Sequence, residues 1–197
     1  MLYYQKGGYA TGYSLKKPQS TNRDRVERTF TEVLPNGTTS GQYFGYDYQR
    51  PNGNWQGTSW VSAVKKAYRQ YCTDFRQSYL EYLVRQHFRK LDDPNFDFKD
   101  SWKKLSQSDR LKYKSESAEI QCDPTVIYLR EMTPGNNKAD FTYRERRYYV
   151  MSNPISPKEV KPSTGKTPRI YRFVPKVYPM KLDETLQEFR QRKNIKN

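Results

Sequence analysis

The stretch TSWVSAVKKAYRQYCTDFRQSYLEYLVRQHFRKLDDP, residues 58–94, is the only part of the chain with strong helical periodicity. Apolar and aromatic residues recur in it at steps of three and four, which places them on one face of a helix. They are Val64, Tyr68, Tyr71, Phe75, Tyr79 and Tyr82. Thr58 or Ser59 can cap the start. Asp92-Asp93-Pro94 ends the helix near Lys90, because the residue before a proline avoids helical conformation.

Two shorter helices are expected between this long helix and Pro124. The first brings three apolar side chains to one side, and the second begins at a cap formed by Ser106 or Ser108. The three helices together form a small aromatic core around Trp102. The side chains expected in that core are Phe98, Trp102, Leu105 and Tyr113.

The two flanks predict little regular structure. Residues 1–58 are rich in glycine, proline and tyrosine, a composition that prevents long helices. We expect an extended arm there, with one hairpin in which Thr29–Leu34 and Gln42–Tyr48 pair across the turn Pro35-Asn36-Gly37. Such an arm would place its aromatic rings in grooves on a partner.

Residues 122–197 predict an extended, basic tail. Eight prolines occur from Pro124 to Pro179, with a short apolar run at 126–129 as a candidate strand and a short helix over 182–192. The sequence therefore predicts a mainly α fold with extended irregular arms. Its expected parts are an arm (1–58), a helical segment (59–121) and a tail with a short C-terminal helix (122–197).

Charge indicates what the chain binds. The chain carries a formal net charge of +15, has a mean hydropathy of -1.12, and contains 18 Tyr, 9 Phe and 3 Trp. Residues 124–197 contribute +9 of that charge. Few apolar residues with high charge are typical of segments that become ordered in a complex, here with a large acidic partner. The tail residues expected to bind it are Arg144, Arg146, Arg147, Tyr148 and Tyr149.

No motif for catalysis is present. The sequence lacks GxGxxG and GxxxxGK[ST] phosphate loops, and its only histidine is His87. Cys72 and Cys122 do not form a zinc-ligand pattern. We expect free thiols in a reducing compartment, with a single disulfide as the alternative. We further expect no enzymatic activity, cofactor, small-molecule substrate or membrane association, and an intracellular location, because neither a signal segment nor a long apolar stretch is evident.

The stretch WKKLSQSDRLKYK, residues 102–114, resembles the junction of helices two and three in the HMG box family. That family places Trp-Lys before a Leu or Met, then Ser, an acidic residue, a basic residue, and an aromatic eleven positions after the Trp, here Tyr113. The wider resemblance covers about residues 75–120, but Pro94 and Pro124 shorten the helices and no wedge residue is evident. It implies nucleic-acid contacts by Lys103, Lys104, Arg110 and Lys112.

Two functions follow as hypotheses. The first is a structural protein that binds and stabilises a filament through basic, tyrosine-rich arms. In style the chain is similar to the inner proteins of ciliary doublet microtubules, whose tubulin lattice is acidic, which implies a cilium or axoneme. The alternative is an HMG-box-like protein that binds DNA or RNA in chromatin, the nucleus or a ribonucleoprotein. The near-neutral charge of residues 61–123 favours the first.

Overall fold

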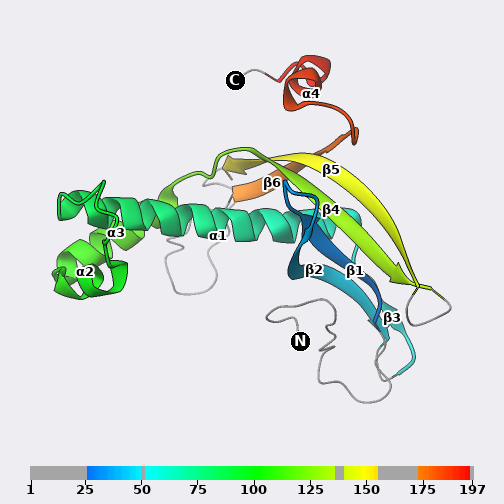
Figure 1. Ribbon diagram of the computed structural model, residues 1–197, viewed down its shortest axis with the longest axis horizontal. Helices are drawn as coiled ribbons and strands as arrows, with labels where there is room; N and C mark the ends of the chain where they lie inside the picture. Colours follow the sequence, from blue (N-terminus) through cyan, green and yellow to red (C-terminus); the bar gives the residue numbers. More distant parts are fainter. Residues whose placement is uncertain (1–25, 50–51, 136–139, 155–172, 196–197) are drawn as a thin grey trace, which may run out of the picture. The chain divides into compact units, whose positions relative to one another are not determined.

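A computed structural model describes residues 26–49, 52–135, 140–154 and 173–195 (Figure 1). In chain order, the elements within these ranges are β1 (Val26–Val33), β2 (Thr39–Gln49), β3 (Trp55–Gln56), α1 (Trp60–His87), α2 (Phe98–Lys104), α3 (Gln107–Glu119), β4 (Thr125–Pro134), β5 (Phe141–Pro154), β6 (Phe173–Met180) and α4 (Leu186–Lys193).

The strands form one sheet in the order β3-β2-β1-β4-β5-β6. The pairs β1–β2, β1–β4, β2–β3 and β4–β5 are antiparallel. The fold is therefore mixed α/β, and the expectation of a mainly α chain with irregular arms is wrong. Both flanks supply strands. In β4 the buried side chains of Ile127, Leu129 and Glu131 alternate with half-buried ones, as expected for a strand with one covered face.

The expected hairpin in the first flank is confirmed. β1 and β2 pair from Thr29↔Tyr46 to Val33↔Thr39. The backbone N–H of Leu34 donates to the carbonyl of Thr38 at 2.8 Å. Gly37 has φ +85, a left-handed conformation that glycine adopts without strain.

The second flank is also folded where the structure describes it. β4 and β5 pair continuously from Thr125↔Val150 to Pro134↔Phe141, which confirms the short strand at 126–129 and extends it. Pro134 and Pro154 lie at strand ends, and Pro175 lies in the terminal strand β6. Proline is tolerated at these positions because they need not donate a ladder hydrogen bond, so proline density there does not indicate an unfolded tail.

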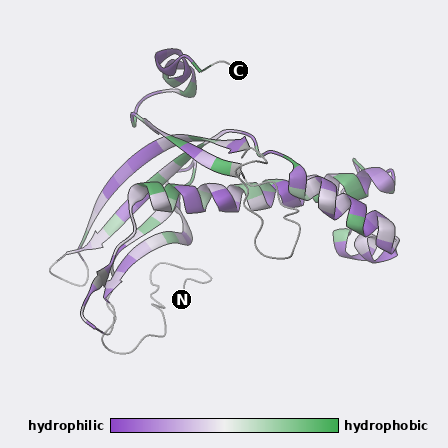
Figure 2. Cartoon of the chain, turned by 180° about the vertical axis from the view of Figure 1, so that it is seen from behind, coloured by the Kyte–Doolittle hydropathy of each residue, from purple (hydrophilic) through white to green (hydrophobic). Residues whose placement is uncertain are grey.

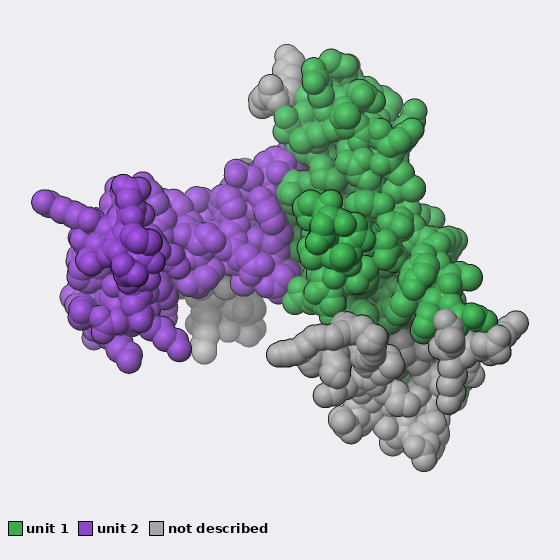
Figure 3. All heavy atoms as spheres, in the orientation of Figure 1, with its two compact units in different colours: residues 1–68, 125–150, 177–197 green, residues 69–124, 151–176 purple. Residues whose placement is uncertain are grey.

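The chain divides into two compact units, coloured separately in Figure 3. Unit 1 combines residues 1–68, 125–150 and 177–197, and unit 2 combines residues 69–124 and 151–176. In unit 1, the first turns of α1 bury five side chains and lie across one face of the sheet (Figure 1). Those side chains are Trp60, Ala63, Val64, Ala67 and Tyr68.

Unit 2 confirms the expected order of helices. α3 begins after Ser106, whose hydroxyl accepts a hydrogen bond from the Asp109 backbone N–H, and α2 is capped in the same way by Asp97. The side chains of the expected core are less buried than predicted. Leu105 is buried, but Phe98 and Trp102 are half-buried and stack on each other at 5.7 Å. Tyr113 is half-buried, and its hydroxyl lies 2.9 Å from Nδ1 of His87.

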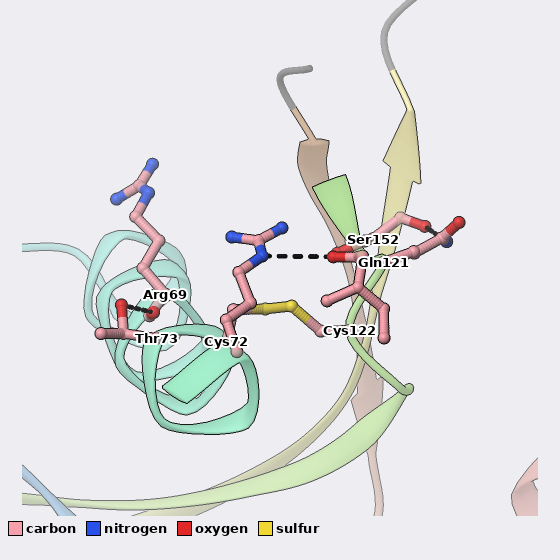
Figure 4. Close-up of a disulfide and its surroundings, with 8 residues drawn as sticks. Arg69, Cys72, Thr73, Gln121, Cys122 and Ser152 are labelled. Atoms are coloured by element: carbon pink, nitrogen blue, oxygen red, sulfur yellow. Dashed lines mark hydrogen bonds between the residues drawn. A yellow bond between two sulfur atoms is a disulfide. The ribbon is translucent and has the colours of Figure 1, made fainter. Parts of the chain in front are cut away.

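A disulfide joins Cys72 of α1 to Cys122, which corrects the expectation of free thiols (Figure 4). The two Cα atoms are 5.5 Å apart, within the range that a disulfide spans. Nearby, Arg76 Nε donates to the carbonyl of Ile120 at 3.2 Å, and Gln121 Nε2 donates to the carbonyl of Ser152 at 2.7 Å. The sequence alone does not predict this contact, because the two cysteines are 50 positions apart and meet only after the intervening helices have folded.

Candidate binding surface on the sheet

Strand register in unit 1 assigns the side chains to two faces. Successive residues of a strand point to opposite faces, and directly paired residues share a face. Phe30 pairs with Glu131, which in turn pairs with Arg144, so these three share what we call the covered face. The ring of Phe30 contacts that of Trp60 in α1 edge-on at 4.9 Å. The covered face is thus the one on which α1 lies.

The covered face holds a buried carboxylate between two arginines. Glu131 is 1% exposed. Its oxygens accept hydrogen bonds from Arg144 at 2.7 and 2.9 Å and from Arg28 at 3.1 Å. Arg28 also pairs with Asp47 at 2.8 Å, and Asp47 accepts from the Thr58 backbone N–H at 2.7 Å. A buried charge needs partners of this kind, so Glu131 is satisfied by side chains of unit 1 itself.

The opposite side of the sheet carries an array of aromatic rings, and we call it the tyrosine face. Thr29 pairs with Tyr46, Thr31 with Tyr43, and Met132 with Tyr143, all on the side opposite Phe30. The rings of Tyr46 and Tyr48 lie 6.0 Å apart. The aromatic residues that strand register assigns to the tyrosine face from β2 to β5 are Tyr43, Tyr46, Tyr48, Tyr128, Phe141, Tyr143 and Tyr149.

The most exposed rings of this face lie at the hairpin end of β5. Tyr143 is 54% exposed and Phe141 is 41% exposed, and alternation places both on the same side. The guanidinium of Arg130 lies 5.3 Å from the centre of the Tyr143 ring. A cation over a ring face is an attractive contact, so Arg130 and Tyr143 form a paired polar and aromatic surface.

Arg130 has an acidic neighbour on the same face. Glu145 lies 3.5 Å from Arg130 and accepts a hydrogen bond from the Tyr128 hydroxyl, a bond that raises the pKa of Tyr128. Buried side-chain atoms without a hydrogen-bond partner among the described residues occur on both faces, at Nε of Arg28 on the covered face and at Nε of Arg130 and Oγ1 of Thr29 on the tyrosine face. These atoms therefore do not distinguish the two faces.

α4 covers one end of the tyrosine face. Phe189 is fully buried and packs against Tyr149 at 5.2 Å and Tyr178 at 6.4 Å. Arg147 donates to the carbonyls of Leu182 at 2.9 Å and Glu184 at 2.7 Å. This end is therefore used for internal packing, unlike the hairpin end.

An ion pair holds the turn that leads into α4. Glu184 accepts two hydrogen bonds from Arg192, at 2.6 and 2.7 Å, and a third from the backbone N–H of Lys181 at 3.1 Å. Hydrogen bonding to Arg192 lowers the pKa of Glu184 from 4.5 to about 2.

The five tail residues expected to bind a partner all lie in β5, much of which is hydrophilic (Figure 2). Their side chains are engaged within unit 1. Arg144 pairs with Glu131, Arg146 lies 4.7 Å from the ring of Trp60, and Arg147 binds the turn before α4. Tyr148 and Tyr149 are 4% and 2% exposed. Alternation along one strand thus sends RERRYY to both faces of the sheet.

The four basic residues singled out by the HMG-box resemblance lie in unit 2. Lys104 pairs with Asp100 at 2.7 Å, and Arg110 donates to the carbonyl of Trp102 at 3.4 Å. Lys112 lies 5.8 Å from the ring of Tyr113. Lys103 is exposed at the end of α2. The structure does not gather these four cations into one cluster by any contact among the described residues.

The sequence predicts that Tyr43, Tyr46 and Tyr48 lie in the second strand of a hairpin within an extended arm, with their rings in grooves on a partner. It assigns no binding role to Tyr128, Arg130 or Tyr143. A period-two pattern was available in both strands, as Tyr-x-Arg-x-Met at 128–132 and Phe-x-Tyr-x-Glu at 141–145. The pattern becomes a surface only when β4 and β5 are paired in register.

Most of the net positive charge comes from residues outside the described ranges. Those residues include 23 of the 36 basic and 19 of the 21 acidic side chains, a net charge of +4. The ranges 1–25 and 155–172 each carry five basic residues and one acidic residue, and so a net +4 each. The described residues are therefore nearly balanced in charge.

Within the described ranges no group of three or more His, Cys, Asp or Glu residues could hold a metal ion. No helix in the same ranges is long and apolar enough to cross a membrane. No known protein family, curated protein or solved structure matches the chain.

Proposed function

We propose that this chain is a non-enzymatic binding subunit of a large acidic assembly. The tyrosine face of the sheet carries this proposal. It presents exposed rings beside an arginine, whereas the charged groups of the covered face are engaged with one another. Tyrosine and arginine are the residues enriched at binding interfaces, because each contributes area and a polar group together.

The surplus charge supports an acidic partner. A net charge of +15 attracts polyanions at long range, and +8 of it comes from residues 1–25 and 155–172. In the proposed arrangement these segments supply attraction, and the tyrosine face supplies contact. A nucleic-acid-containing particle, such as a ribonucleoprotein, provides both phosphates and unpaired bases for such contacts.

A doublet microtubule in a cilium is the second candidate assembly. It is favoured by the small number of cations on the tyrosine face itself, where Glu145 balances Arg130. A nearly neutral, tyrosine-rich surface suits a protein partner such as an acidic tubulin lattice. Extended arms do not support this candidate over residues 26–49 and 140–154, because those residues form β1, β2 and β5 of the sheet.

Charge-neutralising variants test the proposal. Lys158, Lys161, Lys166, Arg169 and Arg172 are all changed to Gln in the full chain. Binding to nucleic acid or to polymerised microtubules is then followed by co-sedimentation at several salt concentrations. We expect weaker binding with a smaller salt dependence, because fewer counterions are released. The matched control exchanges Lys and Arg at the same five positions and keeps wild-type binding. A chain that binds neither polymer would refute the proposal.

A further inference from the structure

The hairpin end of the tyrosine face has a chemistry more specific than general attraction to acidic surfaces. Tyr143 and Phe141 stand two residues apart on β5, so their Cα atoms are about 7 Å apart along the strand. Both are exposed, and Arg130 of the neighbouring strand lies over one of them. The arrangement offers two flat apolar faces and one cation on an open sheet.

This combination fits unpaired bases. An aromatic side chain on an open surface stacks on any base, because each base has a π-face, and a nearby guanidinium binds phosphate or a base edge. A paired duplex hides its base faces within the stack, so exposed rings gain little from it. Proteins that recognise the base sequence of a duplex instead insert an α-helix or a β-ribbon into one of its grooves.

We infer that the hairpin end of the tyrosine face binds single-stranded nucleic acid, with bases stacked on Tyr143 and Phe141 and Arg130 contacting the backbone. This inference rests on the proposed function and names the partner of the same surface. Charge complementarity supports it, because the chain carries a net charge of +15 and a nucleic acid carries a negative charge on each phosphate.

The test uses the full chain and a fluorescein-labelled oligouridylate of about 12 nucleotides, a length within the site sizes of known single-strand binders. Binding is measured by fluorescence anisotropy at physiological salt. Stacking contributes about 1–3 kcal/mol per base, so Tyr143→Ala should raise Kd at least fivefold. Tyr143→Phe keeps the ring and should stay within about twofold of the wild-type Kd. An unlabelled duplex of equal length should displace the probe less well than the single strand.

Tyr82→Ala is the matched control, because Tyr82 is 45% exposed but lies on α1 in unit 2. It should leave Kd within about twofold of wild type. Equal losses for Tyr82→Ala and Tyr143→Ala, or no loss for Tyr143→Ala, would overturn the inference. Failure to bind the oligonucleotide, combined with salt-sensitive binding to polymerised microtubules, would overturn it and leave the proposed function standing. Failure to bind either would remove both.

Discussion

The two faces of the sheet have similar residue types and opposite uses. On the covered face, Arg28 and Arg144 pair with Glu131, and Arg146 lies over the ring of Trp60 at the start of α1. The tyrosine face leaves rings exposed at its hairpin end. The difference shows that a basic, aromatic composition does not by itself indicate a binding surface. What decides is whether another element packs on the face and consumes the side chains.

The largest difference between the faces is expected for phenylalanine truncation. Phe30 is fully buried against Trp60, so Phe30→Ala should lower the free energy of unfolding by about 3–5 kcal/mol. Phe141→Ala removes the same atoms from the exposed face and should cost below about 0.5 kcal/mol. Urea unfolding followed by circular dichroism measures both. Equal costs would mean that the two faces are packed alike.

The disulfide should stabilise the chain without altering the contrast between faces, since both cysteines belong to unit 2. Changing Cys72 and Cys122 together to Ser should cost about 2–4 kcal/mol by releasing a 50-residue loop. Reductant should destabilise the wild type by a similar amount and leave the double variant unchanged. A wild-type melting temperature that is insensitive to reductant would contradict this role.

A smaller difference is expected between two glutamates, one on each face. Glu131→Gln leaves Arg28 and Arg144 without their shared carboxylate and should cost about 2 kcal/mol, because the group is buried but Arg144 reaches solvent. Glu145→Gln on the tyrosine face should cost about 0.5 kcal/mol or less, since its pairing with Arg130 at 3.5 Å is half-exposed. Chemical denaturation at neutral pH compares them. A larger cost for Glu145→Gln would reverse our assignment of the faces.

The smallest expected effect is a change in how stability depends on pH under acidic conditions. The pKa of Glu184 is lowered to about 2 from 4.5, so its ion pair with Arg192 contributes full stability above pH 4.5. That contribution should be lost progressively as the pH falls from 4.5 toward 2. In Glu184→Gln the acid dependence of unfolding should be shallower over this range. A variant with the same pH profile as wild type would show that the turn before α4 does not depend on this pair.

Local features of the fold were predictable. The period of apolar residues predicts α1, and its observed bounds of 60–87 agree with a start at Ser59, whose hydroxyl accepts from the Ser62 backbone N–H at 3.1 Å. Ser106 caps α3 as expected, and Asn36-Gly37 forms the β1–β2 turn. These features depend on residues within a few positions of one another, so propensity and capping suffice to predict them.

The candidate surface was less predictable. The composition of RERRYY at 144–149 predicts one basic, aromatic binding segment. In β5, however, the side chain of Arg146 contacts Trp60 of α1, and that of Arg147 binds the turn before α4. Tyr143, just before this segment, is more exposed than Tyr148 and Tyr149, but composition does not single it out. Exposure depends on which elements cover each face, and composition carries no information about that cover.

By itself, the sequence determined the helices, their caps, the first hairpin and the excess of positive charge. Only the tertiary structure decided that β1 pairs with β4, that Cys72 meets Cys122, and that Glu131 is buried between two arginines. The physical reason is sequence distance. The pairing of β1 with β4, the disulfide, and the contact between Arg28 and Glu131 each join residues at least 50 positions apart. They form only once the intervening chain has folded and offset the entropy of closing the loop.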